Sequence, residues 1–283
     1  MTRTREITVG SVRLGGTQPL FLIAGPCVIE SEVHAMKMAE SIRKIAGECG
    51  VPFIFKASYD KANRSSGKSY RGPGMSEGLR ILAKIKRQCK VPILTDVHEV
   101  SQVAPAAKVC DILQIPAFLA RQTDLLIAAG KSRRVVNLKK GQFLSPWEMT
   151  NAVEKVASTG NRNILVTERG TTFGYQNLVV DMRAFPIMKK IGYPVVFDVT
   201  HSVQLPGGQG SASGGQPEFI EPLARAGVAA GVDGVFLEVH DNPSKALSDG
   251  SNALPLDQLG ALLARLKELA AMVRGWDGPE RGR

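Results

Sequence analysis

The sequence predicts a (β/α)8 TIM barrel, and three observations support this fold class. Eight short apolar or β-branched runs recur along the 283 residues, at positions 21–24, 53–55, 93–95, 112–115, 135–138, 164–166, 195–197 and 234–239. These runs are almost continuously hydrophobic, which is typical of parallel strands covered on both faces. Helical patterns separate most of them. A doubly wound open sheet is the second choice, but no GxGxxG motif follows the first run.

The helical segments are recognised by their apolar spacing. Residues 31–47, 76–89, 146–158 and 218–231 carry apolar side chains three and four positions apart, as on one face of a helix. The last segment shows the pattern most clearly, with Leu256, Leu259, Leu262, Leu263, Leu266, Leu269 and Val273. Most strands are therefore followed by a helix that can cover the outside of a barrel.

The chain ends and one loop fall outside these repeating units. Residues 7–15 alternate around a Gly-Ser pair, which predicts a small hairpin within an extension, residues 1–20, that closes the bottom of the barrel. We see no linker, so we expect residues 1–283 to form a single barrel domain. The Gly/Ser-rich loop 205–217 follows the seventh strand, where we expect a mobile active-site loop, and residues 277–283 should be a flexible tail.

Composition limits the function classes. No apolar run approaches the ~20 residues that a membrane helix needs, the N-terminal residues do not resemble a signal peptide, and the four cysteines lack CxxC spacing, so we expect a cytoplasmic protein without a membrane partner. The net charge of +10 suits nucleic acid, an anionic membrane surface or a multiply charged small substrate. Aromatic residues make up only 6%, and basic runs never exceed two residues, which favours small polyanions over nucleic acid.

Polar residues collect just past the predicted strands, where the chemistry of such barrels is found. The stretch KANRSS at residues 61–66 combines two cations, an amide and two hydroxyls, which suit a phosphate and the hydroxyls of a sugar. The other residues at strand ends are Cys27, Lys56, Asp96, His98, Gln114, Lys139, Lys140, Glu168, Arg169, Asp198, His201, Glu238, His240 and Asp249. One rim of the barrel should therefore hold several cations beside metal-capable groups.

Four of these residues form a candidate metal site. Cys27, His201, Glu238 and Asp249 offer a sulfur, an imidazole and two carboxylates, a mixture that suits one divalent ion such as Fe, Mn, Zn or Co. Each has an ordinary structural alternative, namely core packing, a helix cap, a salt bridge and a turn. Together they follow the first, seventh and eighth strands, which are neighbours in a closed barrel, and this favours the metal site.

Several long motifs resemble the 3-deoxy-D-manno-octulosonate 8-phosphate synthase family from end to end. They are AGPC at 24–27, KANRSS at 61–66, TDVHE at 95–99, QIPAFLARQTD at 114–124, FDVTH at 197–201 and ALSD at 246–249. The resemblance implies a cytoplasmic, usually homotetrameric transferase that condenses phosphoenolpyruvate with D-arabinose 5-phosphate and water for lipopolysaccharide biosynthesis. Cys27 implies the metal-dependent branch, because the metal-free branch has Asn there.

The resemblance also implies residue roles. Lys56 and Lys61 are expected to face the phosphoenolpyruvate carboxylate, with Gln114, Lys139 and Arg169 on its phosphate. Asn63, Arg64 and Ser65 are expected to bind the arabinose phosphate, and Asp96 and His98 to lie near the reacting carbons. Lys61, Asp96, His201 and Asp249 form the predicted catalytic set. The proton acceptor for the attacking water remains open between a metal-bound hydroxide, His201 and Asp96.

Three other functions are considered. The 3-deoxy-D-arabino-heptulosonate 7-phosphate synthases, which use erythrose 4-phosphate, usually have Lys-Pro-Arg where this chain has Lys61-Ala62-Asn63-Arg64. A metal-dependent aldolase would not release phosphate. A basic binding module for nucleic acid or an anionic regulator would need a basic stripe away from the strand ends, together with strongly salt-dependent binding.

Overall fold

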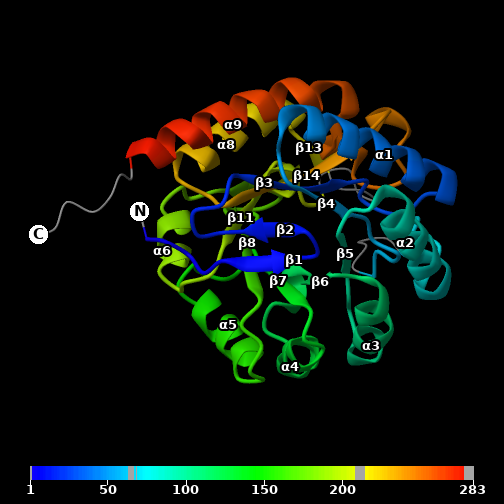
Figure 1. The fold of residues 1–283 in the computed structure, drawn as a ribbon, viewed down its shortest axis with the longest axis horizontal. Coiled ribbons are helices and arrows are strands. Elements are labelled where there is room, and N and C mark those ends of the chain that lie inside the picture. The colour runs from blue at the N-terminus through cyan, green and yellow to red at the C-terminus, as the bar shows by residue number, and fades with distance from the viewer. Residues whose placement is uncertain (1, 63–66, 68, 208–213, 277–283) are drawn as a thin grey trace, which may run out of the picture.

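Eight parallel strands close into a barrel, which confirms the predicted fold class (Figure 1). The computed structural model describes residues 2–62, 67, 69–207 and 214–276. In chain order the barrel strands are β3 (Phe21–Gly25), β4 (Phe53–Lys56), β5 (Ile93–Asp96), β6 (Ile112–Ile115), β7 (Val135–Lys139), β8 (Ile164–Glu168), β11 (Val195–Asp198) and β14 (Gly234–His240). Strand β14 pairs with both β3 and β11, and this pairing closes the barrel and excludes the open sheet.

Helices surround the strands (Figure 1). They are α1 (Glu32–Cys49), α2 (Met75–Cys89), α3 (Val100–Val109), α4 (Thr123–Lys131), α5 (Met149–Ala157), α6 (Ala184–Lys189), α7 (Val199–Ser202), α8 (Ile220–Ala229) and α9 (Leu259–Trp276). Short 3-10 turns are η1 (Ala117–Leu119), η2 (Pro217–Phe219), η3 (Pro243–Lys245), η4 (Gly250–Asn252) and η5 (Leu256–Gln258). Within the described ranges, no helix combines the length and apolar character needed to cross a bilayer.

The predicted hairpin closes the amino-terminal end of the barrel. Strand β1 (Ile7–Val9) pairs antiparallel with β2 (Val12–Leu14), and its side chains enter the core. Ile7, Val9 and Leu14 are buried against apolar barrel residues. These are Phe21, Ile23, Ile54, Leu94, Ile112, Val135, Leu165, Val196 and Phe236. The hairpin and the lower interior of the barrel thus form one apolar cluster.

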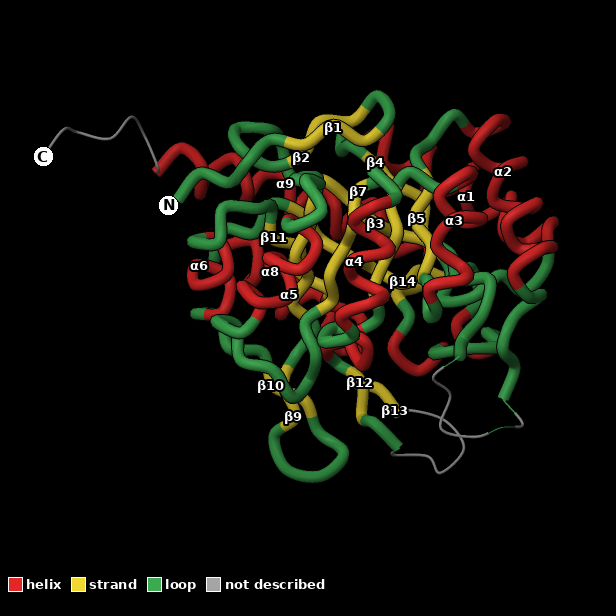
Figure 2. The backbone as a smooth tube through the Cα atoms, turned by 90° about the horizontal axis from the view of Figure 1, so that it is seen from below, coloured by secondary structure: helices red, strands yellow, loops and turns green. Residues whose placement is uncertain are grey.

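Short pairings lie at the opposite end of the barrel (Figure 2). Strand β9 (Thr171–Thr172) pairs with β10 (Leu178–Val179), and β12 (Gln204–Leu205) pairs with β13 (Gly214–Gly215). Strand β15 (Leu254–Pro255) extends the sheet beside the end of β14. A strand of two residues is too short to show a periodic pattern, so the sequence does not predict these strands. The β12–β13 pairing joins the base of the predicted loop 205–217, whose mobility stays a prediction because residues 208–213 lie outside the described part.

A close backbone contact sets the position of the first site residue. A Cβ atom on Gly25 would lie 1.9 Å from the carbonyl oxygen of Lys56, so only glycine allows β3 and β4 to end this close together. An isolated parallel bridge between Val28 and Ser58 continues the contact beyond the strands. Cys27 is thereby held at the carboxyl end of the barrel, next to the end of β4.

The hairpin contacts lead to a stability prediction. We expect Leu14→Ala to lower the free energy of unfolding by about 2–5 kcal/mol, because it removes a fully buried side chain from the apolar cluster. Thr8→Ala, on the exposed side of the same hairpin, should change it by no more than about 0.5 kcal/mol. Urea denaturation measures both. Equal midpoints for Leu14→Ala and the parent chain would show that the hairpin does not stabilise the barrel.

Candidate active site

A pocket opens at the carboxyl ends of the barrel strands, where the sequence places the site. Its lining residues are Lys61, Asp96, His98, Gln114, Pro116, Ala117, Phe118, Lys139, Gln142, Arg169 and His201. Seven of these are residues that the sequence analysis assigned to catalysis or substrate binding. Asn63, Arg64 and Ser65 lie outside the described residues, so their placement stays a prediction.

The four candidate metal ligands converge beside this pocket. Ligand atoms of Cys27, Glu238 and Asp249 all lie within 4.8 Å of one another. His201 Nε2 is 3.4 Å from Glu238 Oε1 and 3.9 Å from Asp249 Oδ2. Cys27 Sγ lies 3.1 Å from Asp249 Oδ2. Residues more than 200 positions apart in the chain therefore meet because β3, β11 and β14 are neighbours in the closed barrel.

The donor set fits a divalent ion. Glu238 Oε2 is buried and makes no hydrogen bond within the described structure, so this carboxylate oxygen is available for a ligand. Burial raises the pKa of the Cys27 thiol, and the carboxylates of Asp249 and Glu238 raise it further. A cation among these groups would reverse that effect, because it favours the thiolate over the thiol.

Asp198 orients the histidine of this cluster. It ends β11 and caps α7, where its Oδ1 accepts hydrogen bonds from His201 N and Nδ1, each at 3.0 Å. A proton on Nδ1 leaves the Nε2 lone pair facing Glu238 and Asp249, as metal-binding histidines require. In the sequence, Asp198 is recognisable only as a polar residue at a strand end, without an assigned role. The signal was the Asp-x-x-His spacing directly after a strand.

Lys56 supports the cluster from below the pocket. Its ammonium group is fully buried and donates to Glu238 Oε1 at 2.8 Å and to the carbonyl of Cys27 at 2.9 Å. It is not among the residues that line the pocket. Its expected contact with a substrate carboxylate therefore stays a prediction, whereas its contact with Glu238 is direct.

Lys61 and Asp96 form the charged pair at the pocket floor. Lys61 Nζ lies 3.6 Å from Asp96 Oδ2 and 4.0 Å from Glu238 Oε1. Burial alone would raise the pKa of Asp96, but the ammonium groups of Lys61 and Lys56 hold it well below its usual range. Burial opposes the charge of Lys61 as well, yet Cys27 and the nearby carboxylates raise its pKa. Both groups are therefore charged near neutral pH.

A chain of buried hydrogen bonds joins side chains on β8, β7, β6 and β5 with one that follows β4, and it meets on Asp96. Thr167 Oγ1 donates to Asn137 Oδ1 at 2.6 Å, and Asn137 Nδ2 donates to Gln114 Oε1 at 2.8 Å. Gln114 Nε2 then donates to Asp96 Oδ1 at 2.5 Å, and Ser58 Oγ donates to Asp96 Oδ2 at 2.6 Å. Because a carboxylate only accepts, every amide in the chain has one orientation.

Of the residues joined by these hydrogen bonds, Gln114 and Asp96 are among the predicted site residues. Ser58, Asn137 and Thr167 are not. Asn137 interrupts an otherwise apolar strand, and Thr167 follows directly on three apolar residues of the next. A polar side chain inside a doubly covered strand must find a partner there, so these positions carried a usable signal.

Two further cations face the pocket. Arg169 donates through Nη2 to Gln204 Oε1 at 2.7 Å, whereas its Nη1 is buried without a hydrogen-bond partner in the described structure. Lys139 pairs with Asp198, and its Nζ lies 4.1 Å from the centroid of the Phe236 ring. Burial lowers the pKa of Lys139. An anionic ligand would satisfy the unpaired guanidinium donor of Arg169.

Comparison with known proteins identifies the family of the chain. The model of the DAHP synthetase I family matches residues 3–274. The chain belongs to the DAHP synthetase I family. A relative from Trichlorobacter lovleyi is 62% identical over 271 residues, which cover 96% of this chain and 100% of the relative. Relatives from Pelobacter propionicus and Geobacter sulfurreducens are 63% and 60% identical with the same coverage.

All three relatives are named 2-dehydro-3-deoxyphosphooctonate aldolase. That name denotes the 3-deoxy-D-manno-octulosonate 8-phosphate synthases, so it confirms the resemblance that the sequence motifs indicated. Within the DAHP synthetase I family, the chain is thus similar to the octonate enzymes along almost its whole length.

The first hydrogen bond of the chain, from Thr167 to Asn137, leads to a stability prediction for this member of the DAHP synthetase I family. We expect Thr167→Val to lower the free energy of unfolding by about 1–3 kcal/mol, because Asn137 Oδ1 loses its donor while side-chain volume is kept. Thr172→Val, on the exposed strand β9, should have little effect. Thermal or urea denaturation compares the two. A Thr167→Val protein as stable as the control would contradict the role of this hydrogen bond.

Proposed function

We propose that the chain condenses phosphoenolpyruvate with D-arabinose 5-phosphate and water. The products are 3-deoxy-D-manno-octulosonate 8-phosphate, an intermediate for lipopolysaccharide biosynthesis, and inorganic phosphate. The observation that carries this proposal is an identity of 60–63% to 2-dehydro-3-deoxyphosphooctonate aldolases over nearly the full chain. The proposal makes the chain a 3-deoxy-8-phosphooctulonate synthase, a transferase acting on small phosphorylated substrates.

The pocket supports this reaction through its cations. Both substrates are anionic, and Lys61, Lys139 and Arg169 bring three positive groups to one opening. We assign the phosphate of phosphoenolpyruvate to Gln114, Lys139 and Arg169, because the buried Nη1 of Arg169 has no hydrogen-bond partner among the described residues. Its carboxylate is assigned to Lys61, with Lys56 behind it. These cations hold two negatively charged molecules close together, although the two would repel each other in water.

The pentose phosphate is assigned to Asn63, Arg64 and Ser65, on the strength of the family motif. This stretch begins two residues after Lys61, which lines the pocket. His98 lines the same pocket and is assigned to the reacting end of the sugar. The two substrates would then approach each other between Lys61 and His98.

One divalent ion, with Fe, Mn, Zn and Co as candidates, is proposed at Cys27, His201, Glu238 and Asp249. The grouping of Cys27, Glu238 and Asp249 supports this assignment, as does the approach of His201 to both carboxylates. Glu238 Oε2 also makes no hydrogen bond among the described residues. When bound, such an ion supplies Lewis-acid polarisation of the sugar aldehyde. Cys27 then places the chain in the metal-dependent branch of its relatives.

The reaction joins two carbons and breaks one carbon–oxygen bond. The C3 of phosphoenolpyruvate attacks the aldehyde carbon, water adds at C2, and the resulting hemiketal phosphate expels inorganic phosphate. Lys61 and Arg169 hold the enol phosphate in place while positive charge develops at C2. Asp96 fixes Lys61 and the Gln114 amide through its contacts.

The chain is further proposed to assemble as a cytoplasmic homotetramer. Exposed aromatic side chains support self-association because apolar exposure marks protein contact surfaces. They follow β6, β7 and β8 and are Phe118, Phe143, Trp147, Phe173 and Tyr175. All four cysteines lie in the described residues and none forms a disulfide, as is usual for cytosolic proteins.

A phosphate-release assay tests the reaction. With phosphoenolpyruvate, we expect kcat/KM for arabinose 5-phosphate to exceed that for erythrose 4-phosphate by about 10²-fold or more, because the pentose offers one more hydroxyl to the pocket. The names of the relatives do not favour the heptulosonate alternative. A preference for erythrose 4-phosphate would establish that alternative. Carbon–carbon bond formation without phosphate release would indicate a simple aldolase.

The metal assignment is tested with Cys27→Asn. Loss of the thiolate ligand should weaken metal binding by about 10-fold or more, measured by competition with a chromophoric chelator. Some turnover should remain, because Asn is the residue of the metal-free branch. Cys49→Asn, at the end of α1, is the matched control and should bind metal like the parent chain. Unchanged metal affinity in Cys27→Asn would show that Cys27 is not a ligand.

A further inference from the structure

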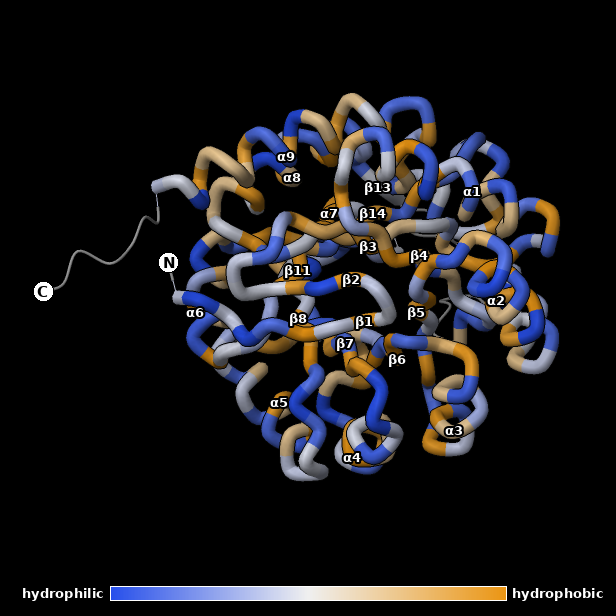
Figure 3. Tube along the Cα trace, in the orientation of Figure 1, coloured by the Kyte–Doolittle hydropathy of each residue, from blue (hydrophilic) through white to orange (hydrophobic). Residues whose placement is uncertain are grey.

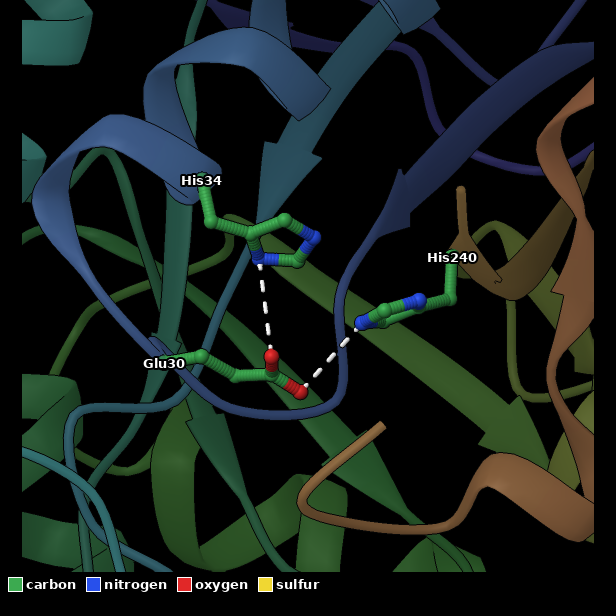
Figure 4. Close-up of side chains that lie close together, drawn as sticks. All are labelled: Glu30, His34 and His240. Carbon is green, nitrogen blue, oxygen red and sulfur yellow. Dashed lines mark hydrogen bonds and ion pairs between the residues drawn. The ribbon is translucent and has the colours of Figure 1, made fainter. Parts of the chain in front are cut away.

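A second group of metal-capable side chains lies close together (Figure 4), and none of its members lines the pocket described above. Glu30 precedes α1, His34 lies in its first turn, and His240 ends β14. Their ligand atoms lie within 4.8 Å of one another. We propose that these three residues bind a second divalent ion of the Zn²⁺ class. The proposal goes beyond the condensation reaction and does not depend on it.

The spacing of the donor atoms suits such an ion. His240 Nε2 lies 3.3 Å from Glu30 Oε1, and His34 Nδ1 lies 3.9 Å from Glu30 Oε2. Ligands about 2.0–2.1 Å from a tetrahedral ion are about 3.3–3.4 Å apart. The first pair is at that spacing, and the second, which ends on the other carboxylate oxygen of Glu30, exceeds it by about half an ångström. Two imidazoles and one carboxylate are a common set for Zn²⁺, with a fourth position left for water.

The surroundings of His34 favour metal binding. Its Nε2 lies 3.1 Å from Asp241 Oδ1, so a proton on Nε2 leaves the Nδ1 lone pair facing Glu30. Nδ1 is buried and has no hydrogen-bond partner in the described structure. Lys37 donates to the other Asp241 oxygen at 2.7 Å. With neutral imidazoles, Glu30, Asp241 and Lys37 carry a net charge of −1, which attracts a cation.

His240 sets the cost of binding. Its Nδ1 accepts a hydrogen bond from the backbone amide of Asn242 at 2.9 Å. The ring proton is therefore on Nε2, which donates a hydrogen bond to Glu30. When an ion binds Nε2, the ring proton has to be on Nδ1 instead. There it can donate a hydrogen bond to Asp241 Oδ1, which lies 3.3 Å away. The Asn242 amide then loses its acceptor. We therefore expect weaker binding here than at the cysteine-containing site.

An ion at this position would brace the segment that carries Asp249. Glu30 Oε1 accepts a hydrogen bond of 2.8 Å from the backbone N–H of Leu247, which lies two residues before Asp249. The same carboxylate thus joins the start of α1, the end of β14 and the following loop. The competing interpretation is a clamp made by hydrogen bonds alone, and the two differ in the number of ions bound.

Counting metal ions separates the two interpretations. The full-length protein, stripped of metal and dialysed against Zn²⁺, should contain about two ions per subunit by mass spectrometry of the metal. His34→Gln should lose one of these ions and retain the ion at the cysteine-containing site. Glu40→Gln, an exposed carboxylate on the same helix α1, is the matched control and should retain both.

Cobalt titration assigns each ion to its site. Co²⁺ at the cysteine site gives a thiolate charge-transfer band, which Cys27→Ser should lose and His34→Gln should keep. A His34→Gln protein that binds as many ions as the parent chain would overturn the proposal. Circular dichroism confirms that the variants fold, and Glu30→Gln replaces His34→Gln if that variant does not. Because no substrate is used, a failure of the proposed reaction leaves this result unaffected.

Discussion

The buried carboxylate of Glu238 is the group on which the rest of the site depends. It lies inside the barrel with no exposed surface, and an unpaired charge there would be strongly destabilising. Burial alone would raise its pKa, but His201, Lys56 and Lys61 hold the pKa below the usual range. Two of the partners that stabilise this charge, His201 and Lys61, also line the pocket. Folding and chemistry are therefore coupled through one carboxylate.

The interior of the barrel divides into two layers with different chemistry. The lower layer is apolar and is closed by Ile7, Val9 and Leu14 of the hairpin. The upper layer is polar, and its hydrogen bonds run in one direction from Thr167 to Asp96. A rigid apolar base lets the polar layer hold its side chains in single orientations, as a positioned active site requires.

The sequence predicted the strands and the residues at their carboxyl ends, because apolar runs and barrel topology are enough for both. It could not show that Lys56 turns inward to Glu238, since that contact joins residues 182 positions apart. Asp198 was visible as a polar strand end, but its hold on His201 depends on the turn into α7. The hydrogen-bond partners of Asn137 lie on other strands, so no local pattern identifies them.

The sealed lower end has a kinetic consequence. The hairpin of β1 and β2 lies across one end of the barrel (Figure 3), where its side chains pack into the apolar cluster. Ligands therefore reach the polar layer from the opposite end, where the pocket opens. Where two ligands stack in a cavity that is closed at its base, the deeper one enters before the other and leaves after it. A barrel closed at one end therefore favours an ordered sequence of binding and release.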